Sequence, residues 1–231
     1  MLDCISVENM RRSDAETIAK FVPSLDLMHR AAMGVFRAVD WQGRIAIVVG
    51  SGNNGGDGFA LACILNEHKI DCAIFMVSQR LSADSAHNAA KASELGVPIS
   101  PFVPGCLDGF GMVVDCLLGT GFQGALRENY RVAIEEINAS DAQVISVDIN
   151  SGMNGDTGEG ELIVRSDLTV TIGFVKNGLV TPNAGNYMRQ LVCADIGIRL
   201  AKEENKICAT GEYHPNAILS PPWLDMAFIR I

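Results

Sequence analysis

Residues 43–58 read GRIAIVVGSGNNGGDG, and this stretch decides the fold class. Its first part is a short β-branched run between glycines, which is typical of a buried strand in a parallel sheet. The six residues from Gly50 to Gly55 match G-x-G-x-x-G, and the helical pattern of residues 57–68 follows them. Strand, glycine-rich turn and helix in this order predict the first βα unit of a fold that holds ligands against its backbone.

Two features of this unit count against an ordinary NAD-dependent dehydrogenase. That class of enzyme places an acid at the end of the second strand to bind the ribose. The predicted strand 71–77 instead ends in Met76 and Val77, and Asp71 lies at its start. Asp57 lies at the predicted helix N-terminus, where a carboxylate would repel a pyrophosphate. Asp57 is better placed to cap the helix or to meet a hydroxyl group or a metal ion.

The alternation of strands and helices continues along the chain. Helical patterns cover 6–20, 24–40, 57–68, 82–95 and 127–139. Strand patterns cover 44–50, 71–77, 111–118, 143–149, 167–173 and 190–196, with a short extended piece at 97–102. Ser24, which follows Pro23, is expected to cap the second helix. This order predicts an α/β fold with a mostly parallel sheet, helices on both faces and ligands bound at the carboxyl edge of the strands.

Length and composition limit the classes of protein to which the chain can belong. The 231 residues suffice for one large domain with its own core. The net charge of −9 argues against nucleic acid and against anionic membrane surfaces as partners. No apolar run approaches the ~18 residues of a membrane-spanning helix, and the first residues contain no signal-peptide core. The 7 cysteines are widely spaced without a C-x-x-C pair, which is typical of reduced core thiols. We therefore expect a cytoplasmic protein without nucleic-acid or membrane partners.

The pattern changes towards the C-terminus. The stretch KEENK at 202–206 is a solvated charge run, and SPPWLDMAF at 220–228 is an apolar segment broken by prolines. We expect one domain over 1–205 and a C-terminal tail, 206–231, of unknown role that could pack as an arm or join a partner chain.

Glycine is in surplus, because the chain has 23 glycines where an average usage of roughly 7% would give about 16. Most of them fall in four clusters, and three clusters directly follow predicted strands. Glycine permits positive φ and close backbone approach, so we expect the clusters to converge on one cleft rather than to mark scattered turns. The clusters are Gly50, Gly52, Gly55, Gly56 and Gly58; Gly119, Gly121 and Gly124; Gly152, Gly155, Gly158 and Gly160; Gly173, Gly178 and Gly185.

Two aspartates lie at the ends of otherwise apolar strands. Asp115 precedes the second glycine cluster, and Asp148 precedes the third. A buried carboxylate is costly unless it is paired or bound to a cation. A single such aspartate is usually a loop anchor, but two on a glycine-lined edge indicate a site for a hard cation, for acid–base chemistry, or for both.

Four stretches in this order resemble the signatures of one known family. They are VVGSGNNGGDGFALA, DCLLGTGF, SVDINSG and TIGFVKNGL, and the similarity covers about residues 5–200. The chain resembles the YjeF N-terminal domain family, whose enzymes are NAD(P)HX epimerases. The resemblance implies a Rossmann-like three-layer α/β/α sandwich and a homodimer. It also implies exchange of the R and S epimers of hydrated NADH and NADPH, so that a separate S-specific dehydratase can restore the coenzyme.

The resemblance also implies roles for individual residues. One potassium ion per subunit would be held by Asn54, Asp115 and Ser151, and Asp148 would contact the damaged nicotinamide ring. Lys176 lies in the family's K-x-G-L stretch and is a further candidate, with a surface lysine as the alternative. The implied substrate-binding residues are Asn53, Asn54, Gly55, Gly56, Asp57, Gly119, Thr120, Gly121, Phe122, Gln123, Gly124, Ala125, Asp148 and Lys176.

One residue departs from the family pattern. Asn150 stands where the family usually has proline, and proline would rigidify the loop between Asp148 and Ser151. Asparagine tolerates turn geometry, so we expect the same loop path with more freedom.

These residues lead to one catalytic hypothesis and two alternatives. Inverting the hydrated carbon requires losing and regaining a C–O bond, with a positioned proton donor and acceptor. We expect Asp148 to fill that role. A non-catalytic ligand- or protein-binding domain of the same fold is the first alternative, and an NAD-dependent oxidoreductase is the second. Arg80, which follows the second strand, is a candidate contact for a 2′-phosphate.

Overall fold

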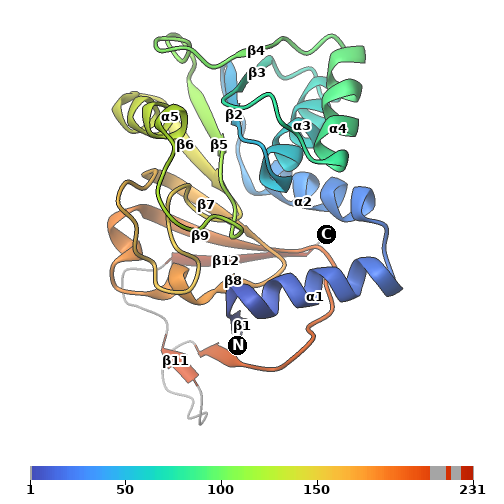
Figure 1. The fold of residues 1–231 in the computed structure, drawn as a ribbon, viewed down its shortest axis with the longest axis vertical. Helices are drawn as coiled ribbons and strands as arrows, with labels where there is room; N and C mark the ends of the chain where they lie inside the picture. The colour runs from blue at the N-terminus through green and yellow to red at the C-terminus, as the bar shows by residue number, and fades with distance from the viewer. Residues whose placement is uncertain (1, 209–216, 220–224, 231) are drawn as a thin grey trace.

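The computed structural model describes residues 2–208, 217–219 and 225–230 of the chain. Its centre is an eight-stranded sheet in the order β12-β9-β7-β6-β5-β2-β3-β4, and every neighbouring pair of strands is parallel (Figure 1). The strands are β2 Ile45–Val49, β3 Cys72–Met76, β4 Ile99–Pro101, β5 Met112–Cys116, β6 Gln143–Val147, β7 Ser166–Ile172, β9 Met188–Asp195 and β12 Asp225–Arg230.

Helices cover both faces of this sheet, as the alternation of strand residues requires. Ile45, Ile47 and Val49 share a core with α2, α3 and α4, whereas Ala46 and Val48 share a second core with α5. Figure 1 shows α5 on one side of the strands and α3 and α4 on the other. The predicted three-layer α/β/α architecture with a mostly parallel sheet is therefore confirmed. The helices are α1 Val7–Lys20, α2 Ser24–Ala38, α3 Asn53–Glu67, α4 Ala83–Glu94 and α5 Glu128–Ala139.

The strand order changes direction between β2 and β5. From β2 the chain winds outward through β3 to β4, and from β5 it winds the opposite way through β6, β7 and β9. In open parallel sheets a ligand crevice forms at such a switch point, beyond the carboxyl ends of the two strands. The motifs that follow β2 and β5 lie at this point.

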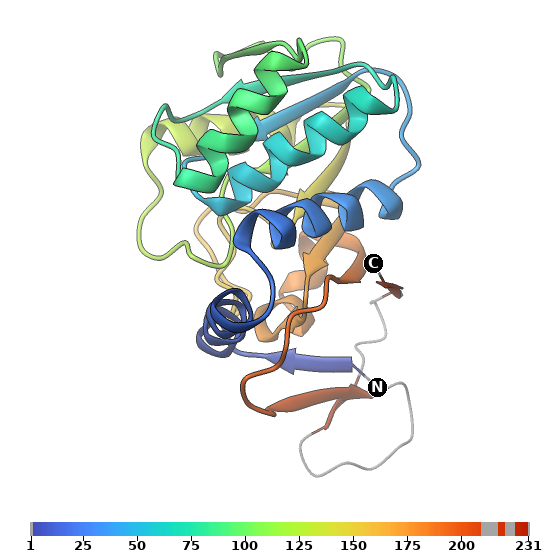
Figure 2. The same cartoon turned by 90° about the vertical axis from the view of Figure 1, so that its right-hand side faces the viewer.

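A second, smaller sheet lies beside α1 at the lower end of the molecule (Figure 2). Its order is β11-β10-β1-β8, with the strands β1 Leu2–Ile5, β8 Val175–Lys176, β10 Asn205–Cys208 and β11 Ala217–Leu219. β1 pairs antiparallel with β10 and parallel with β8. Segments beyond residue 205 therefore join both sheets, since β12 pairs along β9. The first half of the SPPWLDMAF segment, residues 220–224, lies outside the described residues.

The predicted cap of the second helix and the predicted start of the third helix are wrong. Ser24 is the first residue of α2 rather than its cap, because Pro23 occupies the cap position without a side-chain hydrogen bond. α3 begins at Asn53 rather than at residue 57, so Asp57 lies in its second turn and does not cap it. Within the residues that the structure describes, no helix is both long and apolar enough to cross a bilayer.

Candidate active site

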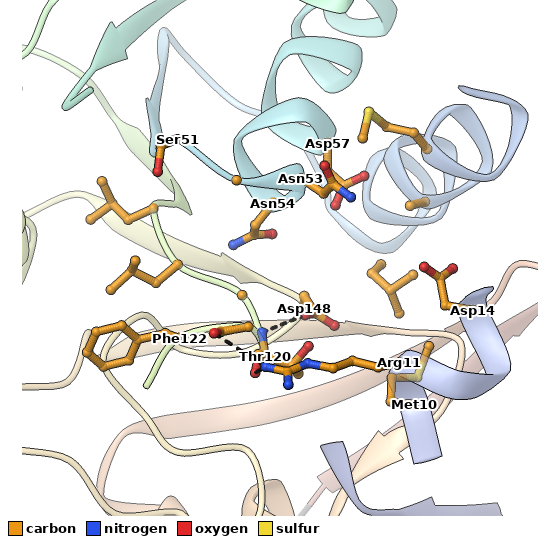
Figure 3. Close-up of a pocket in the computed structure, with 18 of the residues that line it drawn as sticks. Met10, Arg11, Asp14, Ser51, Asn53, Asn54, Asp57, Thr120, Phe122 and Asp148 are labelled. Atoms are coloured by element: carbon orange, nitrogen blue, oxygen red, sulfur yellow. Dashed lines mark hydrogen bonds between the residues drawn. The ribbon is translucent and has the colours of Figure 1, made fainter. Parts of the chain in front are cut away.

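A pocket of about 700 Å³ lies beyond the carboxyl ends of β2 and β5 (Figure 3). Its walls come from the first turns of α3, the loop after β5, the start of the loop after β6, and helices α1 and α2. Ten of the expected substrate-binding residues line it: Asn53, Asn54, Asp57, Gly119, Thr120, Gly121, Phe122, Gln123, Ala125 and Asp148. The first, second and third motifs are therefore brought together at one place in the fold.

Three expected glycines do not line this pocket. A Cβ on Gly55 would lie 2.3 Å from the Gly50 carbonyl oxygen, and a Cβ on Gly56 would lie 2.7 Å from Met28 Sδ. These two glycines let the start of α3 pack tightly against β2 and α2. Gly124 lines a neighbouring cavity beside Gln123 and Tyr187.

Asp148 lies at the carboxyl end of β6 in an unusual backbone conformation. Its φ is +69°, in the left-handed region that residues other than glycine rarely adopt. One carboxylate oxygen accepts a hydrogen bond from the Thr120 backbone N–H at 3.3 Å. The other lies 2.5 Å from Lys176 Nζ. The carboxylate is thus held from two sides at the floor of the pocket.

Lys176 is a fully buried cation rather than a surface lysine. Besides Asp148, its ammonium group donates to Thr171 Oγ1 at 3.0 Å and to the Ile172 carbonyl oxygen at 2.8 Å. All three ammonium protons therefore have acceptors, as a buried charge requires. Lys176 does not line the pocket itself but reaches it through Asp148.

Asp115 is fully buried in β5, beneath the pocket, and four hydrogen bonds reach its carboxylate. Ser151 donates both its backbone N–H and its hydroxyl, at 2.9 and 2.5 Å. Ser146 Oγ and the Leu117 backbone N–H supply the other two, at 2.9 and 3.2 Å. Burial raises the pKa of Asp115, and these hydrogen bonds act in the opposite direction. Within the described part of the chain, no cationic side chain forms an ion pair with Asp115.

Asn54 has a buried amide group without a partner. Its side chain is 6% exposed, and neither its oxygen nor its nitrogen has a hydrogen bond in the described structure. A buried polar group in this state is rare and calls for a ligand, an ion or water. Asn54 also lies close to Asp148, because a Cβ on Gly119 would lie within 3.3 Å of both side chains. The free amide oxygen of Asn54 and the buried carboxylate of Asp115 are oxygen ligands of the kind that a hard cation takes.

Two further carboxyl groups, Asp14 and Asp57, line the same pocket. Burial raises the pKa of Asp57 well above its usual range, and Asp148 and Asp14 add to this effect, whereas Lys176 opposes it. The pKa of Asp14 is raised for the same reasons, first by burial and then by Asp148. No hydrogen bond or ion pair to either carboxyl group occurs among the described residues. Both groups are therefore disposed to hold protons when Asp148 is charged.

Several residues that line the pocket were not predicted from the sequence. Asp14 and Arg11 come from α1, and Arg127 precedes α5, whereas Arg80 does not line the pocket. Arg11 also contacts the loop after β5, with its Nη2 atom 3.4 Å from the Gly121 carbonyl oxygen. An amphipathic helix pattern carries no signal for which polar residue will face a pocket.

The glycine clusters divide into two groups. Gly52, Gly119 and Gly121 line the pocket, but no glycine of the third and fourth clusters does. Those glycines serve tight packing, because a Cβ on Gly152 would lie 2.0 Å from the Leu162 carbonyl oxygen and one on Gly178 would lie 2.5 Å from the Asn154 carbonyl oxygen. The prediction that all four clusters converge on one cleft is therefore wrong for the last two.

The comparison with protein families agrees with this geometry. The model of the YjeF-related protein N-terminus matches residues 24–178. The chain belongs to this family. An NAD(P)H-hydrate epimerase of Limosilactobacillus fermentum is 34% identical over 199 residues, which cover 83% of the chain and 95% of that protein. An NAD(P)H-hydrate epimerase of Rhodopirellula baltica is 33% identical over 207 residues, with 85% of each chain covered.

Two other similarities extend the comparison. A bifunctional NAD(P)H-hydrate repair enzyme of Archaeoglobus fulgidus is 34% identical over 214 residues, which cover 91% of the chain but 45% of that protein. The crystal structure of yeast YNL200c superimposes with a TM-score of 0.72 at 20% identity, over 95% of the chain and all of the yeast chain. This likeness supports the fold alone.

Asn150, which stands where the family resemblance leads us to expect proline, is held by side-chain hydrogen bonds. The Asn150 side chain is fully buried. Its amide nitrogen lies 2.9 Å from the Val164 carbonyl oxygen and 3.0 Å from the Tyr187 carbonyl oxygen. These hydrogen bonds hold the loop at the position where a proline ring would restrain it, and the expected gain in loop freedom stays a prediction.

Proposed function

We propose that this chain is an NAD(P)H-hydrate epimerase, an isomerase that interconverts the R and S epimers of hydrated NADH and NADPH. The observation that carries the proposal is the Asp148–Lys176 pair at the floor of a pocket formed by the family's first three motifs. The activity named for the relatives from L. fermentum and R. baltica supports it. A binding domain without catalysis would have no need of a buried ion pair directed into the pocket.

The chemistry follows from the substrate. The hydrated nicotinamide carries a hydroxyl group on the ring carbon beside the nitrogen. Inversion proceeds when a proton reaches this hydroxyl, the C–O bond breaks, water leaves and the ring nitrogen's lone pair forms an iminium ion. Water then adds to the opposite face and gives up a proton, so the net reaction consumes nothing. Ring opening and closure is the other route, and it needs the same proton transfers.

Asp148 is the proposed acid–base residue. Its carboxylate lies in the pocket with the Lys176 ammonium group behind it, and this ion pair orients the carboxylate. The Thr120 N–H fixes its second oxygen. A positioned carboxyl group of this kind contributes about 10²–10⁴-fold to a rate.

Substrate binding by an acidic chain requires local positive potential. The backbone N–H groups of the loop over 119–125 and of the α3 N-terminus supply it without net charge. Arg11 and Arg127 supply formal charges at the same pocket. We propose that the diphosphate is held by these groups, while Asp148 faces the nicotinamide ring.

We also propose that the site holds one potassium ion per subunit, through Asn54, Asp115 and Ser151. The unpartnered amide of Asn54 and the buried carboxylate of Asp115 support this assignment. When bound, the ion would neutralise Asp115 and order the three loops that surround the pocket.

The decisive experiment is a coupled assay. R-NADHX is mixed with the protein and an S-specific NAD(P)HX dehydratase, and the recovery of NADH is followed by absorbance. Recovery faster than the spontaneous epimerisation supports the proposal, and recovery at the spontaneous rate refutes it.

A variant then assigns the catalytic residue. Asp148→Asn keeps the size of the side chain but removes the basic oxygen, so we expect the epimer exchange to fall to the spontaneous rate. Asp141→Asn, an exposed aspartate at the opposite end of the sheet, is the matched control. Circular dichroism of both variants checks the fold. Normal exchange in Asp148→Asn would show that another group transfers the proton.

The remaining proposals concern the setting of the enzyme. We propose that it acts in the cytoplasm as a homodimer and passes S-NAD(P)HX to a separate dehydratase. The bifunctional name of the A. fulgidus relative, of which the chain spans less than half, supports a role in a repair sequence. Sedimentation of the purified protein would measure the oligomeric state.

A further inference from the structure

Asn150 occupies a central position in the turn that carries the proposed machinery. Asp148 precedes it by two residues, and Ser151 follows it directly. Its amide nitrogen faces the carbonyl oxygens of Val164 and Tyr187, which are acceptors only. These contacts determine which end of the amide is the nitrogen.

The other contacts of Asn150 form a closed ring with two hydroxyl groups of β7. Thr169 donates its single hydroxyl proton to the Asn150 amide oxygen at 2.7 Å. In the 2.9 Å contact between Ser166 and Thr169 the donor must therefore be Ser166. The two Asn150 amide protons are shared among three acceptors, the Val164 and Tyr187 carbonyl oxygens and Ser166 Oγ, and the 3.0 Å contact with Ser166 Oγ completes the ring. Each side chain donates once and accepts once within the ring, and such circuits strengthen their members cooperatively.

The turn that this ring anchors contains two residues with a left-handed backbone. It is also held by backbone hydrogen bonds, from the Asp148 N–H to the Val170 carbonyl oxygen and from the Met153 N–H to the Asn150 carbonyl oxygen. Asp148 and Gly152 both have positive φ, at +69° and +92°. An aspartate in the left-handed region is held there by its surroundings rather than by preference. The ring fastens the middle of the turn to the neighbouring strand, between these two positions.

We propose that Asn150 is a positioning residue for the epimerase reaction. Its ring with Ser166 and Thr169 holds the turn so that the Asp148 carboxylate meets Lys176 and the Ser151 hydroxyl meets Asp115. This inference rests on the proposed function. The family resemblance leads us to expect proline at this position. In this chain the side-chain hydrogen bonds of Asn150 restrain the turn in place of a proline ring.

The backbone of Asn150 allows a direct comparison between the restraint of a proline ring and the restraint of the side-chain hydrogen bonds. Its N–H donates no hydrogen bond within the described structure, so Asn150→Pro removes only the side-chain contacts. Asn150→Ala removes the same contacts and leaves the backbone unrestrained. Ser166→Ala is the mildest change, because it opens the ring and keeps both carbonyl contacts of Asn150.

The test measures kcat and KM for R-NADHX in the coupled assay, at a temperature where each variant is folded. A misplacement of about 1 Å can lower a rate by ~10²-fold, so we expect kcat of Asn150→Ala to fall towards that limit with a much smaller change in KM. Ser166→Ala should lower kcat less, and Asn150→Pro should recover part of the loss. Ile74→Val, at a buried residue of β3 three strands away from β6, is the control whose kcat should not change. Unchanged kcat in both Asn150→Ala and Ser166→Ala would overturn the proposal.

A second readout separates this proposal from the proposed function. Amide hydrogen exchange of the peptide spanning 148–153 should be faster in Asn150→Ala than in the parent protein and in Ile74→Val. If the parent protein does not epimerise NADHX, the proposed function fails, and the exchange rates still report whether the ring anchors the turn. Equal exchange rates in all three proteins would show that the Asn150 side chain does not anchor the turn, even if the enzyme is active.

Discussion

At the scale of single residues, Asp57 is the acid whose surroundings most favour the neutral form. Its half-buried carboxyl group lines the pocket and faces charged groups from three elements. Asp14 from α1 and Asp148 after β6 raise its pKa, Lys176 of β8 lowers it, and the Cys116 thiol of β5 is also close. A protonated Asp57 opposite a charged Asp148 would give the pocket both a proton donor and a proton acceptor.

This environment predicts how stability depends on pH. The pKa of Asp57 is higher in the folded protein than its ordinary 3.8. At a pH between the pKa of the unfolded state and the pKa of the folded state, the native state therefore holds a proton that the unfolded state has released. The free energy of unfolding should therefore fall as pH rises through this window. Asp57→Asn should flatten that fall and make the protein at least as stable at neutral pH.

Urea unfolding at several pH values between about 4 and 8 measures the effect, with Asp141→Asn as an exposed control that keeps the slope of the parent. An unchanged slope in Asp57→Asn would mean that another group, such as Asp14, carries the proton.

At the scale of elements, α1 depends on the segment 196–202 that follows β9. The Arg199 backbone N–H donates to Thr17 Oγ1 at 2.9 Å, and the Ala201 backbone N–H donates to Ser13 Oγ at 3.0 Å. Both hydroxyl groups are fully buried. These bonds keep the helix face that bears Arg11 and Asp14 directed towards the pocket (Figure 3).

Removing one of these acceptors should destabilise the protein. Thr17→Val keeps the shape of the side chain but leaves the Arg199 N–H without a partner, which typically costs about 1–3 kcal/mol. Thr157→Val is the matched control, since Thr157 is exposed and water can replace it as the acceptor for the Glu159 N–H. Urea unfolding of the two variants and the parent gives the comparison. A loss in Thr157→Val as large as in Thr17→Val would show that burial of the N–H does not matter.

Some helices and strands could be predicted from the sequence, and others could not. The strands and helices of the central sheet follow from local periodicity, because each βα unit is built from adjacent residues. The small sheet does not, since its pairing of Cys4 with Asn205 joins the two ends of the chain. The start of α3 was predicted late because asparagine and glycine are poor helix formers. Close packing of Gly55 and Gly56 against β2 and α2 overrides that preference.

Some residues of the site could likewise be predicted from the sequence, and others could not. Asp148 was found from its place at the end of an apolar strand, and Asn54 was found through the resemblance to a family. Asp14 and Arg11 were not found, because they reach the pocket only through the docking of α1, which depends on residues 196–202. The hydrogen bonds of the Asn150 side chain were also not predicted, because its hydroxyl partners lie on β7 and sequence periodicity does not indicate side-chain hydrogen bonds.

At the scale of the whole molecule, the chain must bind an anion despite a net charge of −9. The pocket brings Asp14, Asp57 and Asp148 together, with Asp115 buried beneath them. Repulsion among these acids and a diphosphate would oppose binding unless something offsets it. Backbone N–H groups, Arg11 and Arg127 supply part of the compensation, and a bound monovalent cation would supply more where no side chain pairs with Asp115.

Potassium should therefore stabilise the folded protein by mass action. An ion that binds only the native state contributes RT ln(1 + [K⁺]/Kd), which is about 2.7 kcal/mol at a concentration of 100 times Kd. The melting temperature in KCl should exceed that in NaCl of the same ionic strength, so that general screening cancels. Asn54→Ala should abolish this difference because it removes the free amide oxygen, whereas Asn66→Ala on the same helix, away from the pocket, should preserve it. Equal melting temperatures of the parent protein in the two salts would contradict the potassium site, and the unpartnered amide of Asn54 would then have to be satisfied by the substrate itself.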